Sequence, residues 1–322
     1  MWFKNILLYE ILEPFPFDAA TLNERLAKKS IRPTNKTEMQ TLGWISPFGE
    51  TSEVYSHSIG GCHFLKVCKE VRILPNPVVQ EQLAKKLQEI EANESRKVFS
   101  REKARLKEDI VFDLLPKAFT HRTYTYLYID TKQRWIIVDS SSRAVAETIL
   151  QLFRDTIGNI KLALPEFDVT PTRLMTEWLR DLNLPSYFDI EDNCELKELH
   201  NGDGIIKCQR QDLSAAEVQN HLKSGKNVVK LGLTWRDRMS FAFEEDGAIK
   251  KVSCLDIINE ARKEIETESD AQKLDADFTI MMGEFREFIT DLFGLLKENN
   301  KADKNEEVEE IEAELEEEEL VE

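Results

Sequence analysis

Basic residues cluster in one stretch of an otherwise acidic chain of 322 residues. Between residues 96 and 107 the only acid is Glu102, and the cations are Arg96, Lys97, Arg101, Lys103, Arg105 and Lys107. Lysine and arginine at this density can neutralise the phosphates of a polyanion. A solvated, salt-bridged helix face uses the same residue types. Both interpretations stay open, and the first predicts a polyanion-binding surface.

A second basic group follows later in the chain. It combines cations with amides in Lys207-Cys208-Gln209-Arg210-Gln211-Asp212, and it continues with His221, Lys223, Lys226 and Lys230. Each of these residues alone is an ordinary surface residue. Together with the first cluster they could follow a phosphate backbone through charge and amide donors, without selecting bases.

Asp275 and Asp277 are the strongest candidates for catalysis. A metal-dependent nuclease would need such a carboxylate pair. A helix is expected to start at this point of the chain, so N-capping explains the two aspartates more simply. We therefore predict no catalytic residue, and the nuclease remains an alternative.

A metal site is a weaker possibility. His57, Cys62, His63 and Cys68 do not have the spacing of a zinc site, and the two cysteines lie on a strand-like segment, so we predict core cysteines. The sequence contains neither GxxxxGK[ST] nor a GxGxxG after a strand, which argues against an ATPase. We predict no metal and no cofactor.

The net charge of −17 is unevenly distributed. Residues 301–322 hold twelve acids and two lysines, a net of −10, so the other 300 residues carry about −7. A basic surface can therefore exist on an acidic body. Five cysteines without a CxxC indicate reduced thiols in a cytoplasmic protein, and no apolar run approaches the roughly 18 residues of a membrane helix.

The predicted fold class is α+β, built from several β-α-β-β type modules and one helical arm. The predicted divisions are an N-terminal module (1–76), the arm with a gate segment (77–120), a central module (121–165), a C-terminal module (166–300) and an acidic tail (301–322). The arm should hold two one-sided helices, because Val78 to Asp113 contains no proline or glycine and apolar residues recur at helical spacing. The tail is expected to be disordered or a loose acidic helix.

Local signals predict the other helices. Asp18 is a candidate N-cap, and Ser140-Ser141-Ser142 should cap a helix whose inner stripe is Val145, Ile149, Leu152 and Phe153. A serine cap at Ser214 should start another helix, and Phe278 to Leu296 has the pattern of a strongly amphipathic one.

Several short blocks in order resemble one family. They are Trp2-Phe3-Lys4-Asn5, Gly43-Trp44, Ile73-Leu74-Pro75-Asn76-Pro77, Leu114-Leu115-Pro116-Lys117-Ala118-Phe119, Thr176-Glu177-Trp178 and Leu274-Asp275-Ala276-Asp277-Phe278. The series is similar to the bacterial recombination-associated protein RdgC family, from Met1 to about Leu296.

The resemblance implies a non-enzymatic, nucleoid-associated protein that binds DNA without sequence specificity. It implies a horseshoe-like protomer, a ring-shaped homodimer around duplex DNA, and restraint of the RecA recombinase. Phe119 matches an apolar dimer contact. Arg210 and Gln211 match a Lys-Gln pair implicated in DNA contact, Lys226 matches a basic position, and Arg96 matches one in the arm, where Lys97 and Arg101 are further candidates.

Two features depart from the family pattern. The acidic tail extends past it and could compete with phosphate or recruit a basic partner. The arm differs in detail, which leaves open which of its charges face DNA. A regulator that binds a recombination factor directly is the alternative to DNA occupation.

Overall fold

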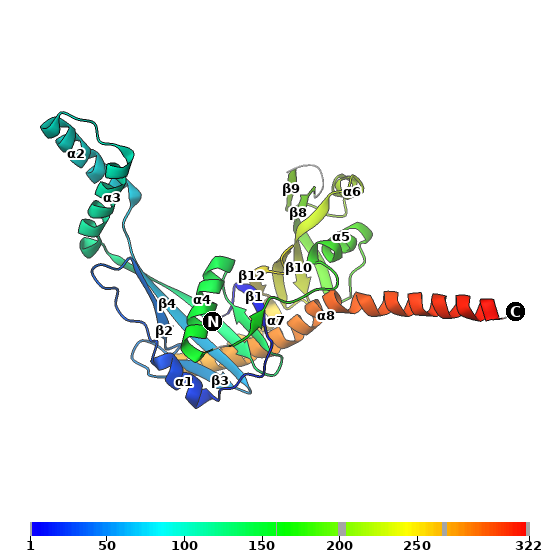
Figure 1. Cartoon of the computed structure of the whole chain (residues 1–322). Coiled ribbons are helices and arrows are strands. Elements are labelled where there is room, and N and C mark those ends of the chain that lie inside the picture. Colours follow the sequence, from blue (N-terminus) through cyan, green and yellow to red (C-terminus); the bar gives the residue numbers. More distant parts are fainter. Residues whose placement is uncertain (1, 159, 199–203, 266–268, 320–322) are drawn as a thin grey trace.

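A twelve-stranded sheet forms the centre of the protein, and every described strand pair in it is antiparallel (Figure 1). The computed structural model describes residues 2–158, 160–198, 204–265 and 269–319. The strands are β1 (Asn5–Ile11), β2 (Gln40–Ile45), β3 (Ser56–Ile59), β4 (Cys62–Arg72), β5 (Thr120–Asp130), β6 (Trp135–Val138), β7 (Leu162–Ala163), β8 (Phe188–Lys197), β9 (Ile205–Gln209), β10 (Asn227–Trp235), β11 (Met239–Glu244) and β12 (Ile249–Cys254).

The two halves of the sheet meet at β1. The strand order is β2-β4-β5-β6-β1-β12-β11-β10-β8-β9, with β3 on β4 and β7 on β1. Asn5 and Ile6 pair with β12, and the following residues from Leu7 to Glu10 pair with β6. The predicted α+β class is confirmed. The sheet runs on through the strands of all three predicted modules, whose boundaries stay predictions.

Helices cover the sheet unequally. They are α1 (Ala19–Ala27), α2 (Asn76–Glu94), α3 (Ser100–Leu114), the 3-10 turn η1 (Leu115–Lys117), α4 (Arg143–Ile157), α5 (Pro171–Asp181), α6 (Ala216–Lys223), α7 (Asp256–Glu264) and α8 (Asp270–Glu319). Alternate residues of β1 point to opposite faces. Leu7 packs in a core with α1 and α4, whereas Ile6 packs in the core formed with α5, α6 and α8. The face that α1 and α4 cover in the N-terminal half carries no described helix in the C-terminal half (Figure 1).

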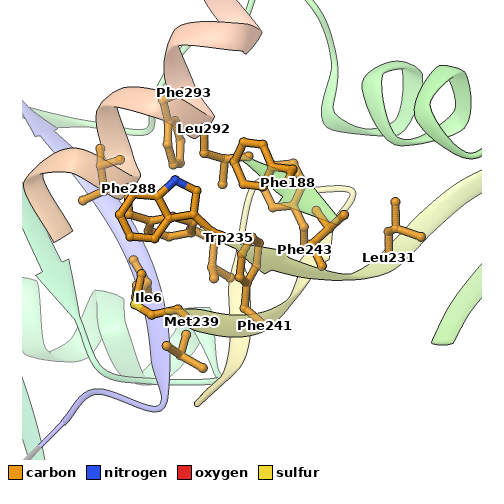
Figure 2. Packing of buried hydrophobic residues seen from close by; sticks show 14 of the residues in the cluster. Ile6, Phe188, Leu231, Trp235, Met239, Phe241, Phe243, Phe288, Leu292 and Phe293 are labelled. Carbon is orange, nitrogen blue, oxygen red and sulfur yellow. The ribbon is translucent and has the colours of Figure 1, made fainter. Parts of the chain in front are cut away.

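Aromatic packing fixes α8 across the sheet (Figure 2). The Trp235 ring meets Phe288 edge-on with centroids 5.5 Å apart, and its indole N–H donates to Asp291 at 2.8 Å. Phe241 meets Phe288 at 4.9 Å. Each fully buried phenylalanine contributes roughly 1.5–3 kcal/mol. The predicted amphipathic helix from Phe278 to Leu296 is therefore confirmed as part of α8.

The predicted arm is present as α2 and α3, which pack against each other and project from the sheet (Figure 1). Pro77 lies in the first turn of α2, where a missing N–H costs nothing. Leu83 of α2 and Ile110 of α3 are buried in a small core of their own. At its base the arm is tied to β4, because the Arg72 guanidinium donates to the carbonyls of Leu115 and Ala118 at 3.1 Å.

Local caps were predicted with mixed success. Asp18 and Ser142 accept hydrogen bonds from backbone N–H groups three residues ahead, as predicted. The helix expected at Ser214 begins instead at α6, with Ala215 as an N-cap that offers no side-chain bond. Val145 is exposed, because α4 turns the small Ala146 toward the sheet.

The whole chain has an open, curved outline. The arm and the β8–β9 end of the sheet rise on the same side of its centre (Figure 1). Helix α8 continues to Glu319, through most of the acidic segment 301–322. In the part of the chain that the structure describes, no helix is both long enough and apolar enough to cross a bilayer.

Candidate nucleic-acid interface

The uncovered face of the C-terminal half contains a hollow of about 270 Å³. It crosses β8 to β12 and is lined by charged and amide side chains, among them Glu191, Asn193, Glu195, Lys207, Gln209, Arg210, Lys230 and Lys251. In Figure 1 the helices α5 and α6 lie on the outer side of these strands, and the uncovered face turns toward the arm. A polar sheet face at this position can meet a polar ligand.

Irregular backbone places two cations in the hollow. Arg210 follows the end of β9 with φ 54°, and Lys251 sits in a bulge of β12 with φ 54°. Left-handed conformations are uncommon for residues other than glycine, and bulges redirect side chains. Neither cation forms an ion pair with a described residue. The sequence analysis did not identify Lys251, although two lysines between the buried Ile249 and Val252 break the strand alternation and signal the bulge.

The other cations of this face are largely neutralised. Lys207 pairs with Glu195 at 3.1 Å. Glu244 bridges Lys230 at 2.9 Å and Lys250 at 2.6 Å. Burial alone would raise the pKa of Glu244, but the two lysines hold it below its usual value. The hollow is therefore polar with balanced charge, and its unpaired positive charge comes from Arg210 and Lys251.

Of the predicted DNA contacts in this region, Arg210 and Gln211 are neighbours and Lys226 lies apart from them. The Gln211 amide follows Arg210 and donates to Glu217 at 3.1 Å. Lys226 precedes β10 at the opposite end of β9, where it is half-buried and lies 3.6 Å from Glu198. The length of β9 separates it from Arg210, a distance of about 15–20 Å. The structure thus brings Arg210 and Gln211 together but not Lys226.

The guanidinium of Arg96 forms ion pairs with two carboxylates, those of Glu94 and Glu102. Arg96 lies in the turn between α2 and α3, after Ser95 in the left-handed conformation. Its guanidinium donates to Glu94 at 2.6 Å and to both oxygens of Glu102 at 2.7 Å. This pairing holds the pKa of Glu102 below its usual value. Arg96 therefore links the end of α2 to the start of α3. It also pairs with Glu102, the one acid between residues 96 and 107.

Five cations between residues 97 and 107 of the arm have no carboxylate partner among the described residues. Lys97, Arg101, Lys103, Arg105 and Lys107 are all solvent-accessible, and none forms an ion pair with a described residue. Arg101 and Arg105 are four residues apart on α3, as are Lys103 and Lys107, and like charges at this spacing repel. The largest group of unpaired positive charge in the described chain is therefore on the arm.

Phe119 lies at the base of the arm and is 83% exposed. Its backbone carbonyl accepts from the N–H of Ile73 at 2.7 Å, so its position is fixed by the end of β4. Ile73 is half exposed beside it. A phenylalanine held in place by its backbone and this largely exposed is typical of an interface residue.

The aspartate pair is not an N-cap, which corrects the sequence interpretation. Helix α8 already begins at Asp270, where Ser269 accepts from the N–H of Gln272 at 3.2 Å. Asp277 is buried and accepts two bonds from Arg262, at 2.6 and 3.1 Å. Asp275 lies 3.0 Å from the imidazole of His57. These partners give both aspartates structural roles.

Cys62 and Cys68 are core residues, as predicted. All five thiols are free, and Cys62 and Cys68 are fully buried. Burial raises the pKa of Cys62 to about 11, which keeps its thiol protonated at neutral pH. Within the described residues, no three His, Cys, Asp or Glu side chains gather in a way that could hold a metal ion.

Comparison with known proteins identifies the family. A family model described as "Putative exonuclease, RdgC" matches residues 1–299. The chain belongs to the RdgC family. Proteins named recombination-associated protein RdgC from Pseudomonas syringae pv. tomato and Pseudomonas aeruginosa are each 37% identical to it over 297 residues, 92% of this chain and 97% of the relative. The namesake from Psychromonas ingrahamii is 35% identical over 289 residues, 90% of this chain and 96% of the relative.

The match to the RdgC family confirms the predicted resemblance and its extent. It covers the sheet, the arm and α8 up to residue 299. The whole acidic segment 301–322, with all twelve of its acids, therefore lies beyond the family model. The name of the relatives refers to recombination and the family description to an exonuclease, which are different activities.

Proposed function

We propose that this RdgC family protein binds duplex DNA without sequence selection, as a ring-shaped homodimer, and limits the access of RecA to that DNA. The observation that carries the proposal is the group of five solvent-accessible arm cations without carboxylate partners among the described residues. Arg210 and Lys251 add two further unpaired cations in the hollow of the C-terminal half. Lysine and arginine contacts to phosphate give affinity without reading bases.

A homodimer would double each basic position around a two-fold axis. The exposed Phe119 supplies an apolar anchor for one contact between protomers. Two curved chains that meet at both ends would enclose a space lined by the arms and the uncovered sheet faces. Closure around DNA would retain it by topology as well as by ion pairs, so that modest contacts suffice.

Salt dependence tests the proposal. With a 30-base-pair duplex, we expect affinity to fall by about three or more decades between 50 and 200 mM salt if six or more phosphates are neutralised. Duplexes of unrelated sequence should bind equally. Fluorescence anisotropy measures both. A strong preference for one sequence, or an affinity that salt leaves unchanged, would contradict the proposal.

An exonuclease is the second candidate, because the description of the matching family model names one. We propose no enzymatic activity, since Arg262 holds both oxygens of Asp277. End-labelled DNA incubated with Mg²⁺ or Mn²⁺ should stay intact. Progressive shortening that disappears in Asp277→Ala would establish the nuclease instead.

Arg96→Ala is expected to weaken duplex binding about tenfold at 100 mM salt, because it releases two carboxylates beside the arm cations. Adding Glu94→Gln and Glu102→Gln to this variant should restore binding, since the released charges are then gone. Anisotropy titrations of the single and triple variants measure the effect. If the triple variant stays weak, Arg96 acts on phosphate directly.

Phe119→Ser is expected to weaken one contact between protomers, because it removes an apolar anchor while leaving the exposed site of the monomer unstrained. Sedimentation over a dilution series should show dissociation at higher concentration than for the unchanged protein. Thr120→Ser, at the exposed neighbour, is the control. An unchanged dimer mass throughout the series would contradict this role of Phe119.

A further inference from the structure

Phe99 is exposed at the turn of the arm without a structural role there. Its side chain is 76% exposed and makes no ring contact with any described residue. It occupies the N-cap position of α3, where Ser, Thr, Asp or Asn would accept a backbone hydrogen bond, and it provides no cap. Phenylalanine at this position therefore stabilises neither the helix nor the small core of the arm.

The turn around Phe99 is held in one arrangement. Arg96 joins the end of α2 to the start of α3 through Glu94 and Glu102. The N–H of Val98 lies 3.4 Å from the Glu91 carboxylate, which it approaches as a donor. The backbone carbonyl of Phe99 accepts the first helical bond of α3 from Lys103 at 2.9 Å. The aromatic ring is thus presented to solvent by an ordered turn.

Unopposed cations flank the ring on both sides. Lys97 precedes it by two residues and Arg101 follows it by two, and both are exposed without an ion pair to a described residue. Arg96 occupies the Glu94 and Glu102 carboxylates, so Lys97 and Arg101 are left available to a ligand. Proteins that bind single-stranded nucleic acid commonly place an aromatic side chain between cations. A base stacks on the ring, and the neighbouring phosphates form ion pairs with the cations.

Two other partners fit less well. A stable protein interface buries about 800 Å² on each side, far more than one phenylalanine ring among cations offers. Bases in duplex DNA are stacked on each other and expose no face. An unpaired base has a free face, and stacking tolerates any base.

We propose that the turn of the arm is a stacking site for an unpaired base, in which Phe99 receives the base and Lys97 and Arg101 hold the adjoining phosphates. The proposal rests on the proposed function, since it adds a single-strand contact to a protein that binds DNA. Its ligand is single-stranded DNA or RNA of any sequence.

Variants of Phe99 test the proposal with a labelled twelve-residue oligothymidylate. Phe99→Ala should bind it between about fivefold and 150-fold more weakly, the effect of losing one stacked base. Phe99→Tyr should bind normally, because it keeps the aromatic face. Phe99→Leu is the discriminating control: it keeps an apolar side chain but offers no ring, and it should bind as weakly as Phe99→Ala. Duplex affinity should stay within about twofold in all three variants.

Two results would overturn the stacking site. Normal oligothymidylate binding by Phe99→Ala would show that the ring is not used, and normal binding by Phe99→Leu would show that apolar contact alone suffices. A fall in dimer mass for Phe99→Ala would also overturn it, because Phe99 would then belong to a contact between protomers. Failure of the proposed function is distinguishable, since the unchanged protein would then bind neither duplex nor oligothymidylate.

Discussion

Charge reversal of the arm in Lys97→Glu/Arg101→Glu/Arg105→Glu is expected to weaken duplex DNA binding by about three or more decades at 100 mM salt. Each reversal removes one neutralised phosphate and adds a repulsive charge. The dependence of log affinity on log salt should flatten by about 0.9 for each phosphate that is no longer neutralised. Anisotropy titrations at several salt concentrations measure the affinity and the slope together.

A matched control separates the arm from net charge. It reverses three exposed cations elsewhere that already pair with neighbouring acids: Lys28→Glu, Lys161→Glu and Arg180→Glu. This variant has the same net charge as the arm variant, and we expect it to lose less than about tenfold in affinity. Equal losses in the two variants would show that total charge, rather than the arm, governs binding.

The arm variant also separates the two accounts of RecA inhibition. If the protein acts by occupying DNA, inhibition of RecA strand exchange should disappear together with DNA binding. Inhibition that persists without DNA binding would favour direct contact with a recombination factor.

Asp130→Asn is expected to lower the free energy of unfolding by about 3–5 kcal/mol, because it leaves Arg286 without its partner inside the protein. Asp130 is 1% exposed at the end of β5. Arg286 of α8 donates to both its oxygens, and the Tyr128 hydroxyl donates to one of them at 2.8 Å. The bond joins α8 to the sheet. Urea unfolding followed by tryptophan fluorescence measures the loss.

Asparagine is the informative replacement, since it can still accept from the N–H groups of Lys132 and Gln133, which bond Asp130 at 3.0 and 3.1 Å. Glu81→Gln breaks an exposed ion pair with Lys85 and is the control, with no measurable change expected. If Asp130→Asn costs no more than this control, the buried pair does not stabilise the fold.

The stability difference should depend on pH in a known direction. Burial would raise the pKa of Asp130, but the bonds from Arg286, the Gln133 N–H and Tyr128 hold it below its usual value. A carboxyl with a lowered pKa contributes its stability above the pKa of the unfolded chain, about 3.9, and loses it as pH falls through the lower folded value. The difference in the free energy of unfolding between the unchanged protein and Asp130→Asn should therefore be largest at pH 7 and should decrease below about pH 4.

Much of the local structure could be predicted from the sequence because it depends on neighbours. The stripes on α2 and α3 follow from apolar residues at helical spacing, and Asp18 and Ser142 accept hydrogen bonds from N–H groups three residues ahead. The start of α8 was misplaced, although Ser269 is an ordinary local cap signal. Val145 was predicted to face the core because its spacing fits the apolar stripe of α4. In the structure the adjacent Ala146 is buried there instead, and Val145 is exposed.

The sequence by itself determined the family, the α+β class, the basic arm and the core cysteines, since each depends on residue types and their order along the chain. Only the tertiary structure decided that β1 pairs with β12 about 245 residues away, that Arg96 is occupied by two glutamates, and that Arg210 lies apart from Lys226. The physical reason is that an ion pair or a strand contact depends on distance in space. Spacing along the chain does not give that distance once the chain turns back on itself.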